Sequence, residues 1–253
     1  MFAAQDLSQD GFLGGRLLVA QPKAGYRAAM DPVLLAAACP ARAGQSVLEL
    51  GCGAGVASLC LGWRVPDLRL SGLELQPAYA ALARENGARN GLALEVHEGD
   101  LIAPPAVLRA QSFDHVIANP PYFAPGDGTC AADSGRERAR REATPLALWV
   151  GQALRRLRQG GQITLIQQAD RLADVLGALA GGAGSTRVLP IAPRQGRPAG
   201  RIIVQACKGG RGTLTLLAPL VLHAAPSHER DGEDLTAEAR AILRDGAALP
   251  LAG

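Results

Sequence analysis

Short apolar runs alternate along the chain with longer stretches in which apolar residues recur every three or four positions. The runs are typical of buried strands, and the longer stretches are typical of helices that bury one face. The strand-like runs are 16–21, 45–50, 68–75, 93–100, 113–119, 162–168, 185–192, 200–207 and 213–223. The helix-like stretches are 30–39, 51–63, 76–91, 144–161, 170–182 and 235–246. In the first of these, Asp31 is the expected N-cap, with Pro32 at the first helical position.

This alternation predicts an α/β protein with a mostly parallel sheet and helices on both faces. The adjacent runs 185–192 and 200–207 predict an antiparallel hairpin at one edge of the sheet. We expect a single domain over residues 1–253, with an N-terminal strand and helix extension (1–44), a core (45–210) and a C-terminal strand and helix (211–253). Ligands of such sheets bind beyond the carboxyl ends of the strands.

The composition limits the class of protein. Hydrophobic residues make up 48% of 253 residues, so general disorder is excluded, and the net charge of +3 is too small to indicate nucleic-acid binding by itself. The five cysteines form no C-x-x-C pair, and no apolar stretch reaches the length of a membrane span. The four histidines show no metal-ligand spacing, so no metal is expected. These features predict a cytoplasmic protein.

A glycine-rich turn, ELGCGAG, follows the strand-like run 45–50. Gly51, Gly53 and Gly55 do not fit the dinucleotide pattern G-x-G-x-x-G/A, because Val56 stands at its third glycine, and no Lys-Ser/Thr follows as a phosphate loop would need. The turn, led by Glu49, resembles the S-adenosylmethionine loop of class I methyltransferases. The alternative is an ordinary tight turn between a strand and a helix.

Two acidic residues end the next strand-like runs. Glu74 is placed to accept hydrogen bonds from both hydroxyls of a ribose, and Asp100 from the exocyclic amine of an adenine. The structural alternatives are a solvated carboxylate for Glu74 and a turn or helix-capping residue for Asp100.

The fourth motif, Asn119-Pro120-Pro121-Tyr122, ends the strand-like run 113–119. The Asn119 side-chain carbonyl and the Pro120 backbone carbonyl can hold an amino group by its protons and turn its lone pair toward a methyl donor. The prolines fix φ and so position these acceptors in advance. Tyr122 offers a face for stacking a flipped-out base, worth about 1–3 kcal/mol. The alternative is an Asn-Pro turn that only caps a strand.

Together the four motifs resemble class I methyltransferases that modify planar amino groups through N-P-P-Y. The stretches GFLGGRLLVAQPKAGYRAAMDPVLLAAA, NPPYFAPGDGTCAADSGRERARREATPLAL and DGEDLTAEARAIL are similar to the bacterial family that makes N6-methyladenosine next to the anticodon of a valine tRNA. The resemblance implies a Rossmann-like class I methyltransferase fold with a seven-stranded sheet and S-adenosylmethionine as cofactor. It places Glu49, Gly51, Gly53, Gly55, Glu74, Asp100 and Asn119 around the cofactor, with Asp31 near its mouth, and Asn119 to Tyr122 on the target base. Leu235 stands where the family would have an aromatic residue.

A tRNA substrate requires phosphate contacts, and two groups of arginines are candidates for them. Arg136, Arg138, Arg140 and Arg141 follow the N-P-P-Y motif, and Arg194 and Arg197 lie in the hairpin together with Arg201. The alternative for both groups is a solvated, charged surface. We expect a monomer.

Other acceptors and roles stay open. A protein glutamine amide fits the same motif, as in the release-factor methyltransferases, although those enzymes usually carry an N-terminal helical domain. Guanine N2-methyltransferases of ribosomal RNA and DNA adenine methyltransferases usually carry additional domains, for which this chain has no room. A non-enzymatic RNA-binding module on the same scaffold is the remaining alternative, and the intact motifs argue against it.

Overall fold

The computed structural model describes residues 2–121, 144–225 and 234–251. The helices are α1 (Met30–Ala38), α2 (Val56–Arg64), α3 (Pro77–Arg89), α4 (Ala106–Arg109), α6 (Leu146–Arg156), α7 (Leu172–Leu179) and α8 (Ala237–Asp245), with 3₁₀ turns η1 (Ala4–Asp6) and η2 (Ala169–Arg171). The strands are β1 (Leu7–Phe12), β2 (Leu17–Pro22), β3 (Ser46–Leu50), β4 (Arg69–Glu74), β5 (Leu94–Glu98), β6 (Phe113–Ala118), β7 (Leu157–Gln168), β8 (Ala183–Arg194), β9 (Arg201–Lys208), β10 (Thr215–Leu216) and β11 (Leu220–His223).

The main sheet has the strand order β10-β8-β9-β7-β6-β3-β4-β5, and β11 also pairs with β8. Only β9 runs against its neighbours β7 and β8, so the predicted mostly parallel α/β sheet is confirmed. The described residues form nine strands in this sheet rather than seven. The predicted strand 213–223 is divided into β10 and β11 around Pro219, which has no N–H for a strand ladder. Because both pieces pair with β8, the β8–β9 hairpin does not form the edge.

Two other boundaries differ from the prediction. Helix α6 ends at Arg156 rather than at residue 161, because Leu157 already pairs with Phe113 at the start of β7. The predicted strand 16–21 is β2, but it pairs with β1 in a separate two-stranded sheet. We did not predict β1, since its Ser-Gln-Asp centre has no apolar alternation.

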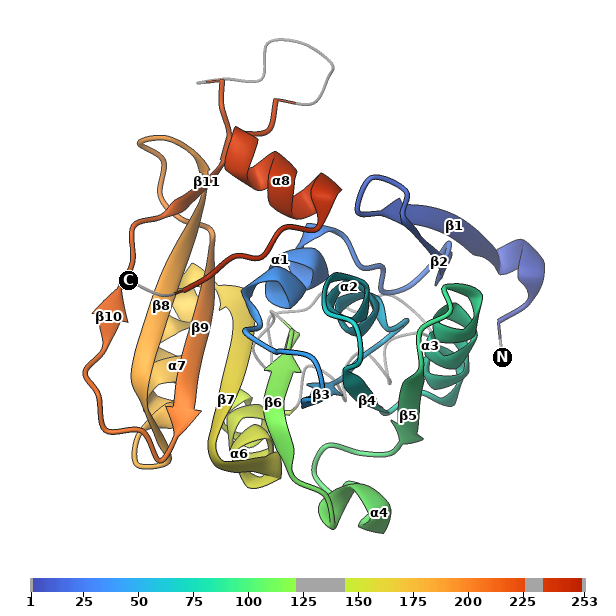
Figure 1. Cartoon of the computed structure of the whole chain (residues 1–253), viewed down its shortest axis with the longest axis horizontal. Helices are drawn as coiled ribbons and strands as arrows, with labels where there is room; N and C mark the ends of the chain where they lie inside the picture. Colours follow the sequence, from blue (N-terminus) through green and yellow to red (C-terminus); the bar gives the residue numbers. More distant parts are fainter. Residues whose placement is uncertain (1, 122–143, 226–233, 252–253) are drawn as a thin grey trace.

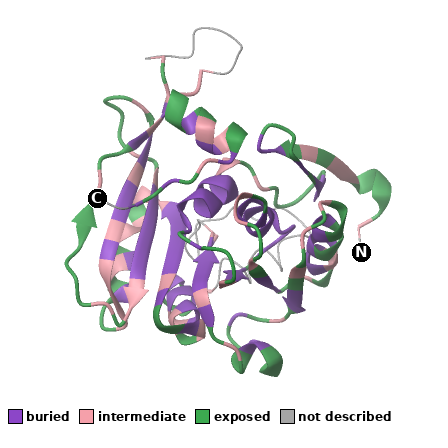
Figure 2. Cartoon of the chain, in the orientation of Figure 1, coloured by how far each residue is buried: buried purple, intermediate pink, exposed green. Residues whose placement is uncertain are grey.

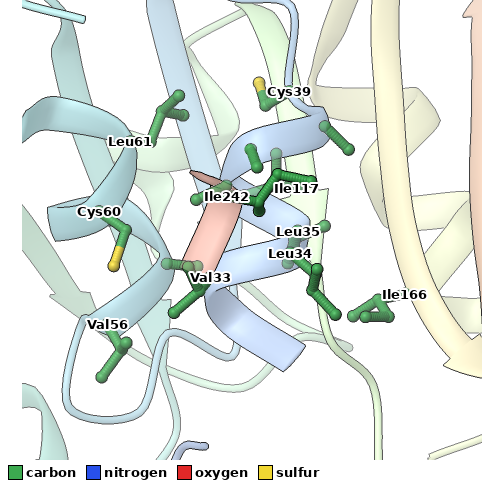
Figure 3. Close-up of a cluster of buried hydrophobic side chains, with 14 of the residues drawn as sticks. Val33, Leu34, Leu35, Cys39, Val56, Cys60, Leu61, Ile117, Ile166 and Ile242 are labelled. Carbon is green, nitrogen blue, oxygen red and sulfur yellow. The ribbon is translucent and has the colours of Figure 1, made fainter. Parts of the chain in front are cut away.

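Helices cover both faces of the main sheet, as predicted. In the view of Figure 1, α1 and α2 lie in front of the sheet, while α6 and α7 lie behind it. Each face has its own apolar core, and the buried residues concentrate where the helices meet the sheet (Figure 2). On the front face, Leu34 and Leu35 of α1 pack near Ile117 of β6, Ile166 of β7 and Ile242 of α8 (Figure 3).

A segment beyond α8, residues 247–251, passes beside α1. The backbone N–H of Leu249 donates to the Ala37 carbonyl at 2.9 Å, and the side chains of Leu249 and Leu251 are buried in the front core. We refer to residues 247–251 as the C-terminal strap. Within the described part of the chain, no helix has the length and hydrophobicity needed to cross a membrane.

Candidate functional site

The predicted site residues follow the carboxyl ends of four adjacent parallel strands. In the order β6-β3-β4-β5, the strand ends lead to Asn119, to the glycine loop 51–55, to Glu74 and to Asp100. The register aligns them, because Leu50 of β3 lies opposite both Ala118 of β6 and Leu73 of β4. The fold therefore brings the four motifs to one edge of the sheet, where ligands of such sheets bind.

The glycine loop has a backbone that other residues would strain. Gly51 has φ +67°, and a Cβ built there would lie 2.7 Å from the indole of Trp149 on α6. Gly53 has φ +54°, in the left-handed region that side chains disfavour. Trp149 thus packs against the loop at Gly51. Gly51 itself is exposed and can be approached closely by a ligand, whereas Gly53 is buried beside the Tyr26 ring.

Glu49 lies under the glycine loop rather than on its surface. Its carboxylate is buried and accepts hydrogen bonds from the Ser58 backbone N–H at 2.9 Å and the Ser58 hydroxyl at 2.6 Å. Burial raises the pKa of Glu49 to about 7, although the Ser58 hydrogen bonds oppose this shift. The carboxyl group therefore ties the start of helix α2 to the end of β3.

Glu74 ends β4 and holds the other side of the loop. One carboxylate oxygen accepts from the Gly53 N–H at 2.9 Å, and the other accepts from the Gln76 N–H at 2.9 Å. The side chain is 1% exposed. Each oxygen of a carboxylate can accept a second hydrogen bond, so the predicted ribose contact stays compatible with this arrangement.

Asp100 is exposed, and one of its oxygens accepts from the Ile102 N–H at 2.8 Å. Apolar side chains flank the two acidic positions. Leu75, next to Glu74, is 36% exposed, and Ile102 is 56% exposed. Exposed apolar side chains next to these carboxylates in the sequence would suit a flat aromatic group that carries an amine.

Asn119 and Pro120 begin the loop after β6, and Tyr122 lies outside the described residues. The amide of Gln167, buried on β7, approaches the carbonyls of both Pro120 and Pro121 at 3.5 Å. The Asn119 amide nitrogen lies 3.5 Å from the hydroxyl of Tyr26. The first part of the N-P-P-Y loop is thus held between the neighbouring strand and the N-terminal extension.

Asp31 lies on α1 and is buried. Its carboxylate lies 2.7 Å from the guanidinium of Arg201, the first residue of β9, which pairs with Gln168 at the end of β7. Asp31 therefore lies close to the ligand-binding edge, but it serves an ion pair there and does not cap α1, whose N-cap is Ala29. The expected N-cap role of Asp31 is wrong.

The candidate RNA-binding arginines differ in their surroundings. Arg194 is 15% exposed, forms an ion pair with Asp234 at 2.8 Å and donates to the Ala225 carbonyl. Arg197 is exposed in the loop between β8 and β9. Arg136, Arg138, Arg140 and Arg141 lie outside the described residues. Their RNA contacts stay predictions.

Comparison with known proteins places this site in a family. Residues 27–182 match the family described as Methyltransferase small domain. The chain belongs to this methyltransferase family. The tRNA1(Val) (adenine(37)-N6)-methyltransferase of Actinobacillus pleuropneumoniae serotype 7 (strain AP76) is 29% identical over 77% of this chain and 82% of the relative. The enzyme of that name from Dickeya chrysanthemi (strain Ech1591) is 27% identical over 84% and 85%.

The structural comparison agrees on the fold. The crystal structure of a predicted O-methyltransferase from Agrobacterium tumefaciens matches 87% of this methyltransferase and 99% of that chain, with a TM-score of 0.71 and 27% identity. The predicted Rossmann-like class I methyltransferase fold is therefore confirmed.

Sequence reasoning missed several residues that shape this methyltransferase site. Gln167 was placed in a strand without a role, although a polar residue in a buried run is a recognisable signal. Asn86 of α3, fully buried, donates to the Ala54 carbonyl of the glycine loop at 3.0 Å. The sequence around Tyr26 indicated no role in the site, apart from the low number of aromatic residues in the chain. Among the residues that the structure describes, no cluster of three metal-ligating side chains occurs.

Proposed function

We propose that this methyltransferase transfers a methyl group from S-adenosylmethionine to the N6 amino group of adenosine in tRNA, at position 37 of a valine tRNA. One observation carries the proposal: Asn119 and Pro120 leave β6 directly beside the glycine loop that leaves β3. Two oxygens that would hold an amine thus lie next to a backbone that would suit the methyl donor. The relatives named above support the choice of tRNA as substrate.

The residues of the site are chemically suited to bind S-adenosylmethionine. The glycine loop, with Gly51, Gly53 and Gly55 at positive φ, would present its exposed turn at Gly51 to the methionine end. Glu74 would accept from the ribose and Asp100 from the adenine amine, while Leu75 and Ile102 would contact the adenine ring. Glu49 would act from below by holding the loop through Ser58. When bound, S-adenosylmethionine supplies an electrophilic methyl group on a sulfonium.

The N-P-P-Y loop would prepare the acceptor. The Asn119 carbonyl oxygen and the Pro120 carbonyl would accept the two protons of the adenine amine, and this turns the nitrogen lone pair out of conjugation with the ring. Tyr122 would stack on the extruded base. No strong base is required, because the nitrogen loses its proton readily once the methyl group is attached. The preset oxygens are therefore the main catalytic contribution of the chain.

The tRNA would be held by phosphate contacts from Arg197 and, as the sequence predicts, from Arg136, Arg138, Arg140 and Arg141. Arg194 would contact a phosphate only while it also keeps its ion pair with Asp234. We further infer one domain, a monomer and a cytoplasmic location, which suits a tRNA substrate.

A second candidate is methyl transfer to oxygen, because the similar Agrobacterium tumefaciens protein is described as a predicted O-methyltransferase. A hydroxyl acceptor needs a general base or a metal ion to remove its proton. Asn119 and the proline carbonyls cannot take up a proton, so the loop favours an amino acceptor. A protein glutamine amide would fit the same oxygens and remains the alternative among amino acceptors.

The test uses purified protein, S-adenosylmethionine with a tritiated methyl group, and an unmodified valine tRNA transcript. We expect N6-methyladenosine as the product by nucleoside mass spectrometry, and no incorporation into a matched transcript with guanosine at position 37. Release factors and a small-molecule catechol serve as competing acceptors. Label on a protein glutamine or on a hydroxyl, with none on tRNA, would replace the proposal.

A further inference from the structure

Tyr26 lies between the glycine loop and the start of the N-P-P-Y loop. Its side chain is 44% exposed, and its ring carbon Cε1 lies 3.6 Å from the position of a Cβ built on Gly53. Its hydroxyl lies 3.5 Å from the amide nitrogen Nδ2 of Asn119. A single side chain from the N-terminal extension thus touches both halves of the site.

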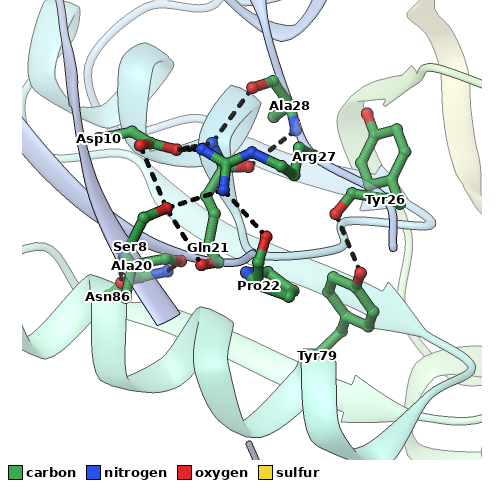
Figure 4. Close-up of polar contacts among 10 residues, drawn as sticks. All are labelled: Ser8, Asp10, Ala20, Gln21, Pro22, Tyr26, Arg27, Ala28, Tyr79 and Asn86. Atoms are coloured by element: carbon green, nitrogen blue, oxygen red, sulfur yellow. Dashed lines mark hydrogen bonds and ion pairs between the residues drawn. The ribbon is translucent and has the colours of Figure 1, made fainter. Parts of the chain in front are cut away.

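The backbone that carries Tyr26 is firmly held (Figure 4). The buried Gln21 amide accepts from the Ala28 N–H at 2.7 Å and donates to the Ala28 carbonyl at 3.2 Å. The Tyr79 hydroxyl donates to the Tyr26 carbonyl at 2.9 Å. Arg27 forms an ion pair with Asp10 at 2.6 Å and donates to the Pro22 carbonyl at 3.0 Å. The backbone position from which the Tyr26 ring extends is therefore set before any ligand arrives.

An asparagine amide has two ends of similar shape and opposite hydrogen-bonding character. Only the oxygen Oδ1 can accept a proton of the target amine, and a flipped amide would offer two donors instead. Because Nδ2 of Asn119 faces the Tyr26 hydroxyl, Oδ1 is turned away from it. In the orientation that the structure has, the hydroxyl oxygen accepts from Nδ2, and Oδ1 lies on the opposite side of the amide.

We propose that Tyr26 is a positioning residue that fixes the Asn119 amide with its oxygen toward the acceptor nitrogen. The inference rests on the proposed function, because it requires Asn119 to hold an amino group. It assigns separate roles to the hydroxyl and the ring of Tyr26. The hydroxyl orients Asn119, and the ring covers the glycine loop at Gly53.

This division predicts a separation of kinetic effects for Tyr26→Phe, which keeps the ring and removes the hydroxyl. Loss of one hydrogen bond that orients the amide should lower kcat about tenfold. The KM for tRNA and the Kd for S-adenosylmethionine should change less than about twofold, since the ring still contacts the loop. A residue that only supported the fold would change the melting temperature and all three constants together.

The experiment compares wild type, Tyr26→Phe, Asn119→Ala and the double variant in single-turnover methyl transfer with enzyme in excess. Tyr79→Phe is the comparison variant, because it removes a hydroxyl that bonds the backbone of the same segment. A loss that arises from loosening of the segment should appear there as a lower melting temperature and a weaker Kd for S-adenosylmethionine, and Tyr26→Phe should show neither change. In the Asn119→Ala background, Tyr26→Phe should cause no further loss, because its effect passes through Asn119.

Full turnover in Tyr26→Phe, or an equal loss with and without Asn119, would overturn the inference while leaving the proposed function in place. Weakened cofactor binding in Tyr26→Phe without a lower kcat would also overturn it. If the wild-type protein transferred no methyl group to tRNA or to any amino acceptor, the proposed function would fail, and the inference with it.

Discussion

At the scale of single residues, Glu49 and Glu74 have a structural role that the sequence does not reveal. Glu49 and Glu74 were expected to face the cofactor, yet both bond backbone N–H groups around the glycine loop. Buried carboxylates with backbone donors hold a loop in the shape that a ligand needs. A substitution at either position should therefore disturb loop geometry as well as ligand contacts.

Glu49 makes stability depend on pH. Burial raises its pKa to about 7, so the folded protein holds this proton more tightly than the unfolded chain, whose carboxyl has an ordinary pKa of 4.5. The stabilisation is fully present below the unfolded pKa and is lost as pH rises through the folded pKa. Relative to Glu49→Gln, the wild type should lose about 2 kcal/mol of unfolding free energy between about pH 5 and pH 8. Urea denaturation of both proteins across this range measures the difference, and parallel pH curves would contradict it.

Asn119 should matter for chemistry far more than for cofactor binding. Replacing it with alanine removes one of the two oxygens proposed to hold the acceptor amine, so methyl transfer should fall at least about a hundredfold. The Kd for S-adenosylmethionine, measured by calorimetry, should stay within a few-fold of wild type. Turnover at the wild-type rate would exclude the proposed role of Asn119.

At the scale of elements, the positions of the core strands along the chain were the most predictable feature, because continuous apolar runs identify buried parallel strands. The four motifs were correctly expected at strand ends, and they lie at one edge because β6, β3, β4 and β5 are neighbours. Strand β1 and the boundary between α6 and β7 were not predictable, since tertiary pairing decides them. The Tyr26 and Gln167 contacts join segments that lie far apart in the sequence, and no local pattern indicates such contacts.

A side chain of helix α3 hydrogen-bonds the backbone of β2, as a neighbouring strand would. The Asn86 side chain accepts from the Ala20 N–H at 2.8 Å and donates to the Ala20 carbonyl at 3.0 Å, while also reaching the Ala54 carbonyl. Asn86→Asp keeps an acceptor, but it removes both donated bonds and buries a charge. We expect a loss of about 3 kcal/mol or more in unfolding free energy.

Asn90→Asp is the matched control, because Asn90 bonds the backbone of Leu18 in the same manner near the surface. It should cost about 1 kcal/mol. Equal losses for the two variants in urea denaturation would show that burial of the Asn86 contacts is unimportant.

At the scale of the whole molecule, the front core is assembled from both ends of the chain. Leu249 and Leu251 of the C-terminal strap pack in the same cluster as Leu17 of β2 and Leu34 of α1. Leu249→Ala should lower the unfolding free energy by about 2–4 kcal/mol, because it leaves a cavity in this core. Leu216→Ala, at a side chain that is 65% exposed, should stay within about 0.5 kcal/mol of wild type. Comparable losses for both variants would argue against a structural role for the strap.

The strap also has a consequence for biosynthesis. A nascent chain can form α1, α2 and the first strands while the ribosome is still reading the later codons, but the cluster around α1 is closed only by leucines near residue 250. Until those residues emerge, apolar surface on the earliest helices stays uncovered and open to chaperones. Synthesis of Leu249 and Leu251 therefore decides when the cluster around α1 can close.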